Sequence, residues 1–395
     1  MVRDVGDLGD LGDIGDLRDI GDLRDIGDLR DIGDLRDIGG LAVPGDPPAL
    51  DDLAALLEEL SNACGLPGDE REVRDLLHRV LEPHVDEIRT DPIGNLLCRR
   101  GGGPVRVMLD AHMDEVGLMV AGYADGGLLR VRECGAIDPR VLAGRSVLVG
   151  RDRVPGVIGL RPVHFTDPAE RDRATPVKDL LVDIGARTGE EAAAAAPLGS
   201  PVYFSTRFER LSDRVVKGKA LDDRVGCAAL ARLLTAADYP GLTLYGAFTV
   251  QEEAGLRGAQ VAAYNLDPHV ALALEATSCA DVPGVTPPDT ATHLGAGPAI
   301  TLMDGTIVTH QRVRDRLVAL AEEHGVPYQF RRLTTAGTDS GAIFLARTGV
   351  PACTVAAPCR YIHGPAALAD LHDIAALVRL VDLFLDSLDR GEFSL

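Results

Sequence analysis

Leu244-Tyr-Gly-Ala-Phe-Thr-Val-Gln-Glu-Glu-Ala-Gly255 joins an apolar run to two adjacent carboxylates. Residues 244–250 are apolar or β-prone, which predicts a buried strand. Glu252 and Glu253 follow directly, and acids at the end of a buried strand are costly unless something neutralises them. A metal centre would do so, with one glutamate as a ligand and the other handling a proton. A solvated turn that happens to contain two glutamates is the alternative for this stretch alone.

His112-Met-Asp114 is a second candidate site, because it follows another apolar strand predicted at residues 105–109. An imidazole can bind a metal through one nitrogen while the carboxylate two residues on holds the other. A surface loop without function is the alternative.

Three further places carry residues that can bind metals. Asp222 and Asp223 precede a helix predicted from about residue 225 to 236. They are either a plain N-cap pair or a metal bridge (Asp222) beside a brace for the local backbone (Asp223). Glu275 ends a strand predicted at residues 270–275, and His363 follows one predicted at 352–356. Open α/β sheets place their sites outside the carboxyl ends of strands, so we expect these side chains to converge.

The composition and net charge of the chain argue against several classes of partner and location. The chain has 395 residues, 46% of them hydrophobic, and a net charge of −21 at pH 7. This charge argues against nucleic acid and anionic membrane surfaces as partners. No uncharged apolar run approaches the ~20 residues that a membrane span needs. Seven scattered cysteines without a CxxC pair favour reduced thiols and a cytoplasmic location.

Three regions of the chain differ in composition and in predicted secondary structure. Residues 1–46 are a low-complexity tail in which aspartate recurs at every third position from Asp4 to Asp37. Frequent glycine and a period of three do not suit a helix, so we expect a disordered appendage without a chemical role. Residues 118–209 alternate glycine-rich turns with short strands, which predicts a β-rich module. It would be inserted into a larger α/β catalytic domain formed by residues 47–117 and 210–395.

Taken together and in this order, the motifs resemble those of the M42 family of co-catalytic metallo-aminopeptidases, which includes the TET peptidases and proteins once labelled endoglucanases. The resemblance covers about residues 49 to 388, and its motifs lie at residues 91–96, 110–117, 217–226, 250–255, 272–284, 337–343 and 360–365. It implies an α/β fold: a mixed-sheet, three-layer di-metal exopeptidase domain with an inserted, barrel-like dimerisation domain.

The resemblance also implies a ligand set for two divalent metal ions per subunit. His112, Asp222 and Glu275 would hold one ion. Asp222, Glu253 and His363 would hold the other, so that Asp222 bridges the pair. Ligands of this kind without cysteine suit Zn²⁺ or Co²⁺.

By the same resemblance, Asp114 would orient the histidine at the end of its strand, and Glu252 would be the general base for a metal-bridged hydroxide. Thr338 and Asp339 would shape the substrate pocket, although a helix N-cap is the alternative for both. Tyr361 would be a pocket wall or a packing residue.

The expected function is therefore hydrolysis of N-terminal residues from peptides. A di-metal hydrolase of another amide or N-acyl substrate is the first alternative, and a catalytically inactive scaffold is the second. The resemblance further implies self-association through the inserted domain, as a dimer or as dimers that build a dodecamer. No nucleic acid or membrane partner is expected.

Overall fold

The computed structural model describes residues 50–167, 173–236, 238–285, 292–331 and 336–393. The repetitive tail, for which we predicted disorder, lies outside the described residues.

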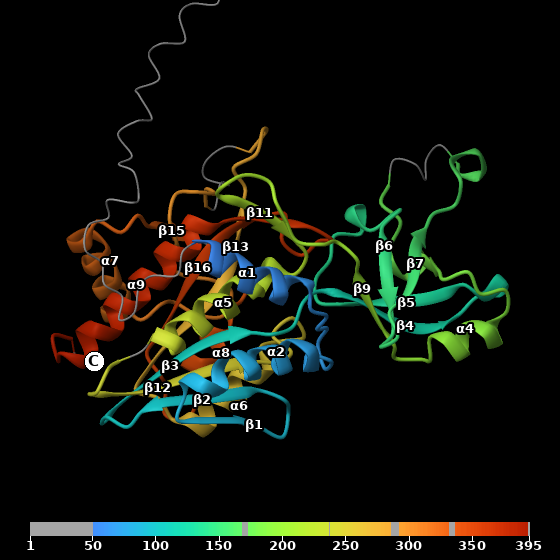
Figure 1. Ribbon diagram of the computed structural model, residues 1–395. Coiled ribbons are helices and arrows are strands. Elements are labelled where there is room, and N and C mark those ends of the chain that lie inside the picture. The colour runs from blue at the N-terminus through green and yellow to red at the C-terminus, as the bar shows by residue number, and fades with distance from the viewer. Residues whose placement is uncertain (1–49, 168–172, 237, 286–291, 332–335, 394–395) are drawn as a thin grey trace, which may run out of the picture. The chain divides into compact units, whose positions relative to one another are not determined.

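An eleven-stranded mixed sheet forms the centre of the larger body (Figure 1). Its main path runs β1 (Glu87–Thr90), β2 (Leu96–Gly101), β12 (Leu242–Thr249), β3 (Val105–His112), β13 (Val270–Cys279), β16 (Ala352–Arg360), β17 (Ala367–Asp370), β11 (Val215–Gly218) and β10 (Glu209–Arg210). The short strands β14 (Ala299–Thr301) and β15 (Gln329–Arg331) pair beside β16. The four central strands β12, β3, β13 and β16 are parallel, so their carboxyl ends share one edge.

Helices cover both faces of this sheet. The larger apolar cluster joins it to α1 (Leu50–Asn62), α2 (Arg71–Leu81), α5 (Leu221–Ala236), α7 (Gln311–His324) and α9 (Leu371–Asp389). A second cluster joins the other face to α6 (Arg257–Leu266) and α8 (Asp339–Phe344). The central strands are buried on both faces, which is why residues 244–250 read as a continuous apolar run. The predicted three-layer α/β arrangement is confirmed.

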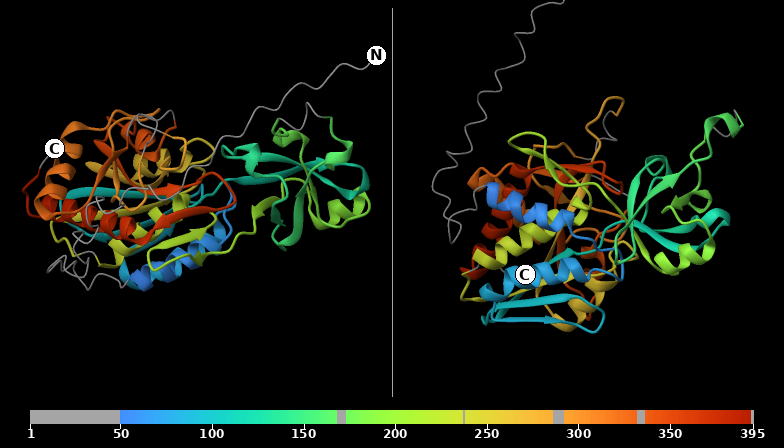
Figure 2. Two further views of the ribbon diagram at one scale, coloured as in Figure 1. Left: turned by 90° about the horizontal axis from the view of Figure 1, so that it is seen from above. Right: turned by 45° about the vertical axis from the view of Figure 1, so that its right-hand side comes forward.

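The β-rich module is a closed six-stranded barrel (Figure 2). Its strands follow the order β4 (Gly117–Tyr123), β5 (Leu129–Cys134), β8 (Leu181–Asp183), β7 (Val154–Gly159), β6 (Ser146–Val149) and β9 (Pro201–Phe204). Inward residues such as Leu129 and Val131 alternate with exposed ones along β5, and α4 (Gly189–Ala195) adds Ala192 to the barrel's own apolar core. The barrel therefore has a core separate from that of the sheet.

Several predicted elements were wrong in extent; β3 and β16, for example, continue past the predicted residues 109 and 356 to His112 and Arg360. β13 continues to Cys279, so Glu275 lies inside the strand and not at its end, because residues 276–279 remain paired with β16. Apolar residues recur at helical spacing from residue 368 to 388, which favours a helix over the whole stretch, but residues 367–370 form β17 between β16 and β11. Apolar spacing cannot separate one helical turn from a short strand, and Asp370 then caps α9 by accepting the amide of His372 at 2.9 Å.

All seven cysteines are free in the structure. Among the described residues, no helix has both the length and the apolar character needed to cross a bilayer.

Candidate metal centre

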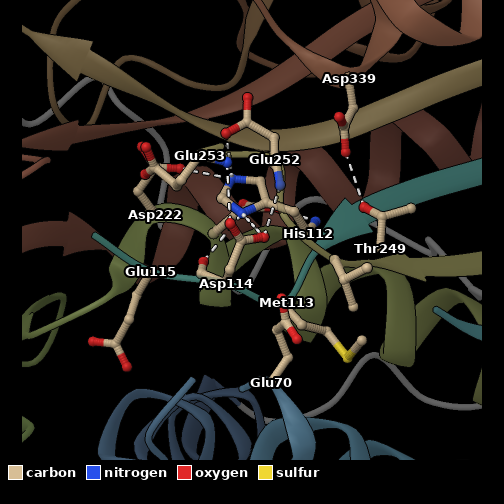
Figure 3. A network of polar contacts seen from close by, with 12 residues as sticks. Glu70, His112, Met113, Asp114, Glu115, Asp222, Thr249, Glu252, Glu253 and Asp339 are labelled. Carbon is tan, nitrogen blue, oxygen red and sulfur yellow. Dashed lines mark hydrogen bonds and ion pairs between the residues drawn. The ribbon is translucent and has the colours of Figure 1, made fainter. Parts of the chain in front are cut away.

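Five of the predicted site residues lie close together at the carboxyl edge of the parallel strands β3 and β12: His112, Asp114, Asp222, Glu252 and Glu253 (Figure 3). His112 is the last residue of β3, and Glu252 and Glu253 follow the end of β12. Asp222 stands at the start of α5, where its backbone angles are not helical. Because parallel neighbours end at one edge, side chains far apart in sequence meet here.

Asp222 lies between two imidazoles. Its Oδ1 is 3.4 Å from Nε2 of His112, and its Oδ2 is 3.2 Å from Nε2 of His363. A glutamate accompanies each histidine: Oε2 of Glu252 is 3.9 Å from Nε2 of His112, and Oε1 of Glu253 is 3.5 Å from Nε2 of His363. Each carboxylate oxygen of Asp222 thus faces a different imidazole.

Asp223 ties the loop of Asp222 to the neighbouring elements. Its carboxylate is fully buried. Oδ2 accepts the backbone amide of His112 at 3.2 Å, and Oδ1 accepts that of Gly226 at 3.0 Å. The contacts join the end of β3 to the first turn of α5, which is the bracing role considered for Asp223.

The carboxylate of Asp114 contacts the backbone of the glutamate pair as well as lying near His112, and the sequence indicated only the second of these. Nδ1 of His112 lies 3.1 Å from the backbone oxygen of Asp114 and 3.6 Å from its carboxylate Oδ1. The two carboxylate oxygens accept the backbone amides of Glu252 and Glu253, each at 3.0 Å. Asp114 therefore holds the glutamate pair as well as the imidazole. Only its position two residues after a histidine was visible in the sequence.

His363 is oriented by a residue that sequence reasoning missed. Its Nδ1 lies 2.9 Å from the backbone oxygen of Ala136, in the segment that follows β5 of the barrel. A donated hydrogen bond to this oxygen leaves Nε2 free to act as a ligand. A main-chain carbonyl carries no side-chain signature, so no sequence pattern could have indicated Ala136.

Glu275 is held differently from the other predicted ligands. Its Oε1 accepts the backbone amide of Asp339 at 2.9 Å. Among the described residues, only Asp222, Glu253 and His363 bring one ligand atom each within 4.8 Å of one another. The structure thus assembles one of the two predicted ligand sets, and the part of Glu275 in the other set stays a prediction.

Burial controls the protonation of the site. It raises the pKa of Glu253 to about 7, and burial together with the charge of Asp339 raises that of Glu275 to about 8. The pKa of Glu252 is also raised well above its usual value, chiefly by burial. Burial opposes a charge on His363, but the hydrogen bond and charge of Asp222 outweigh it and raise the pKa to about 9.

Asp222 shows the opposite shift. Burial would raise its pKa, but the hydrogen bonds and charges of His112 and His363 outweigh burial and hold the pKa below its ordinary value. A carboxylate kept ionised between two imidazoles, and surrounded by further buried carboxyl groups, fits the binding of divalent cations. The donor atoms present therefore suit metal ions.

The three predicted pocket residues differ in environment. Thr338 and Asp339 are buried, whereas 58% of Tyr361 is exposed, so Tyr361 is not an interior packing residue. Thr338 precedes α8 without capping it, since its hydroxyl donates to Oδ2 of Asp304 at 2.7 Å. Asp339 accepts from the hydroxyl of Thr249 at 2.9 Å (Figure 3). A contact of these residues with substrate stays a prediction.

Comparisons with known proteins agree with this geometry. The family model described as M42 glutamyl aminopeptidase matches residues 94–380. A putative aminopeptidase of Acetivibrio thermocellus is 34% identical over 331 residues, which cover 84% of this chain and 98% of that protein. The TET aminopeptidase of Thaumarchaeota archaeon SCGC AB-539-E09 superposes with a TM-score of 0.83 at 33% identity, covering 87% of this chain and 99% of that one.

A third relative is the TET1 peptidase of Pyrococcus horikoshii, described as able to assemble into a tetrahedron or a large octahedral shell. It has a TM-score of 0.75 and 31% identity, over 84% of this chain and 98% of its own. With the family match over most of its length, the chain belongs to the M42 peptidase family and is, as a member, an aminopeptidase that hydrolyses peptide bonds.

Proposed function

We propose that this chain removes N-terminal residues from peptides at a site for two divalent metal ions. The observation that carries the proposal is the position of Asp222, each of whose carboxylate oxygens faces a different imidazole nitrogen at 3.2 to 3.4 Å. A glutamate lies beside each imidazole. Such an arrangement suits two cations that share one carboxylate.

His112, Asp222 and Glu275 would hold one ion, and Asp222, Glu253 and His363 the other. Imidazole and carboxylate donors without thiolate suit Zn²⁺ or Co²⁺. When bound, such a pair of ions supplies an acidified water near neutral pH and polarises the scissile carbonyl.

Glu252 is the proposed general base. Its side chain is 14% exposed, and its Oε2 lies 3.9 Å from Nε2 of His112. The carboxyl group can therefore contact a water molecule at the site while it is largely shielded from bulk solvent. Because burial raises its pKa, Glu252 can keep the proton that it accepts and pass it to the nitrogen of the leaving amine. Asp114 fixes the backbone from which Glu252 projects. The surplus of carboxyl groups around the site favours a substrate that brings a positive charge, as a free α-ammonium group does.

We further propose that residues 118–209 mediate self-association. The assembly described for the TET1 relative supports this, and so does exposed apolar surface on the barrel. Val157, Leu160, Val163 and Phe165 are 45%, 53%, 53% and 77% exposed. A cytoplasmic location is proposed from the seven free thiols.

Glu252→Gln is the test of the catalytic assignment. We expect hydrolysis of aminoacyl-anilides to fall by about a hundredfold or more while the metal content stays that of the wild type. Glu323→Gln, on the exposed face of α7, is the matched control and should be fully active. Wild-type turnover by Glu252→Gln would remove Glu252 from the mechanism.

The substrate class needs a separate comparison. Each peptide is offered once with a free amino terminus and once N-acetylated. Cleavage confined to the free-amine series supports the aminopeptidase proposal. Faster cleavage of the acetylated series would support the alternative, an N-acyl hydrolase.

A further inference from the structure

Beneath the metal centre lies a buried ionic cluster that the proposed chemistry does not use. It consists of Glu115, Lys219 and Arg224, which are 1%, 3% and 0% exposed. Nζ of Lys219 lies 2.7 and 3.0 Å from the two carboxylate oxygens of Glu115. Nη2 of Arg224 lies 3.5 Å from Oε1 of the same carboxylate.

The cluster ties three segments together. Lys219 donates to the backbone oxygen of Ala63 at 2.6 Å, just beyond α1, and its own backbone oxygen accepts the hydroxyl of Ser61 at 2.7 Å. Glu115 forms two hydrogen bonds with Gly65. Its carboxylate accepts the backbone amide of Gly65 at 3.0 Å, and its own backbone amide donates to the backbone oxygen of Gly65 at 2.8 Å.

Arg224 completes the connection. Its Nε donates to the backbone oxygen of Leu60 at 3.0 Å, and its Nη1 donates to the backbone oxygen of Met113. Met113 directly follows His112 in the chain. The guanidinium thus joins the end of α1 to the end of β3.

The members of the cluster flank the proposed ligands in sequence. Glu115 follows Asp114 in the loop after His112, and Lys219 and Arg224 stand on either side of Asp222. The ion pair of Lys219 with Glu115 therefore joins the loop after β3 to the loop before α5. His112 directly precedes the first loop, and Asp222 follows the second at the start of α5. The cluster has two cations, Lys219 and Arg224, and one carboxylate, Glu115. It therefore adds a net positive charge next to a site that is rich in carboxylates.

We propose that Lys219 is a positioning residue which, through Glu115, sets the distance between His112 and Asp222 before metal binds. The inference rests on the proposed function, since it concerns the same metal centre. Its consequence is that Lys219 determines metal affinity without touching a metal. Removing one partner of a buried ion pair leaves an unpaired buried charge and destabilises the fold. A purely structural role for Lys219 would therefore lower the stability of the protein but leave the metal affinity of the folded state unchanged.

The experiment measures metal affinity of the metal-free, full-length protein by competition with a chromophoric Zn²⁺ chelator. Lys219→Met is compared with Lys217→Met, which makes the same change on strand β11 at the partly exposed pair of Lys217 with Glu209. We expect Zn²⁺ to bind Lys219→Met about tenfold to a hundredfold more weakly than wild type, as for other residues that support ligands. Lys217→Met should stay within about twofold. A loss below about tenfold for Lys219→Met overturns the proposal.

A second readout excludes a merely structural effect. Bound metal raises the melting temperature according to its affinity. The positioning role predicts a smaller Zn²⁺-induced rise for Lys219→Met than for wild type. An equal drop in the melting temperatures of the metal-free and Zn²⁺-loaded forms, with an unchanged rise between them, overturns the proposal.

Glu115→Gln keeps the inference testable if Lys219→Met does not fold, because glutamine keeps the size of the side chain and can still accept the amide of Gly65. The same loss of Zn²⁺ affinity is expected, and wild-type affinity in Glu115→Gln would overturn the proposal. The wild-type measurement separates the two hypotheses. If wild type binds no Zn²⁺ or Co²⁺, the proposed function fails and the inference with it. If wild type binds metal and the variants bind it equally well, only the inference fails.

Discussion

Asp114 accepts the backbone amide of Glu252 through its Oδ1 at 3.0 Å. The other oxygen accepts the next amide along the chain, that of Glu253, at the same distance. The fully buried carboxylate of Asp114 thus fixes the backbone of both Glu252, the proposed base, and Glu253, a proposed ligand. The position of the glutamate pair therefore depends on a residue from the loop that follows β3.

Asp114→Asn should impair the site without unfolding the protein. The NH₂ group of asparagine would face a backbone N–H, donor against donor, so one of the two glutamates must move. We expect activity to fall about tenfold to a hundredfold. Asp373→Asn is the matched control, because Asp373 also accepts two backbone amides, of Gly295 and Gly297, each at 2.7 Å. Equal effects of the two variants on turnover would contradict a specific role for Asp114.

Gly135→Ala should disturb the second ligand set. A Cβ at Gly135 would lie 2.8 Å from Oε2 of Glu253 and 2.7 Å from a methyl carbon of Val116. Gly144→Ala is the control, since Gly144 has a similar positive φ, +75° against +79°, but nothing lies within 4 Å of its Cβ position. Both variants bear the strain of about 1–2 kcal/mol for a left-handed residue, but only Gly135→Ala should lose metal affinity. Metal titration of both variants checks this, and equal affinities would refute the assigned packing.

Metal binding should strengthen as pH rises from 6 to 9. In the metal-free protein the pKa values of Glu253, Glu275 and His363 are raised to about 7, 8 and 9, so each group holds its proton at lower pH and releases it across this window. Protons therefore compete with metal most at pH 6, and each proton displaced changes the apparent affinity by roughly tenfold per pH unit. Calorimetry in two buffers of different ionisation enthalpy measures the release. A flat affinity between pH 6 and 9, with no proton release, is the contrary result.

Phe165→Ser should weaken self-association through the barrel. Phe165 is 77% exposed, and burying such a ring at an interface would remove apolar area from water. We expect light scattering to give a mass well above the 41.8 kDa of one chain for wild type and a smaller assembly for the variant. Leu345→Ser is the control, since Leu345 is 74% exposed but follows α8 in the larger body. A monomeric wild type would rule out the proposed assembly.

The sequence alone determined the class of fold and most of the elements. Apolar runs that end in acids or histidine predicted the buried parallel strands, and the helix predicted from about residue 225 to 236 forms most of α5. Strand and helix periods are local properties of the chain, so they can be read without coordinates. The sequence also predicted that His112, Asp222 and Glu253 lie close together, because open α/β sheets place their sites at the common edge where the parallel strands end.

Only the tertiary structure decided how these side chains are held. The amides of Glu252 and Glu253 on Asp114, the oxygen of Ala136 on His363 and the amide of Asp339 on Glu275 are main-chain contacts between distant segments. Every residue except proline offers the same backbone donor and acceptor, so residue type carries no information about which amide or carbonyl arrives at the site. That choice follows from how the strands, the barrel and α8 pack against one another.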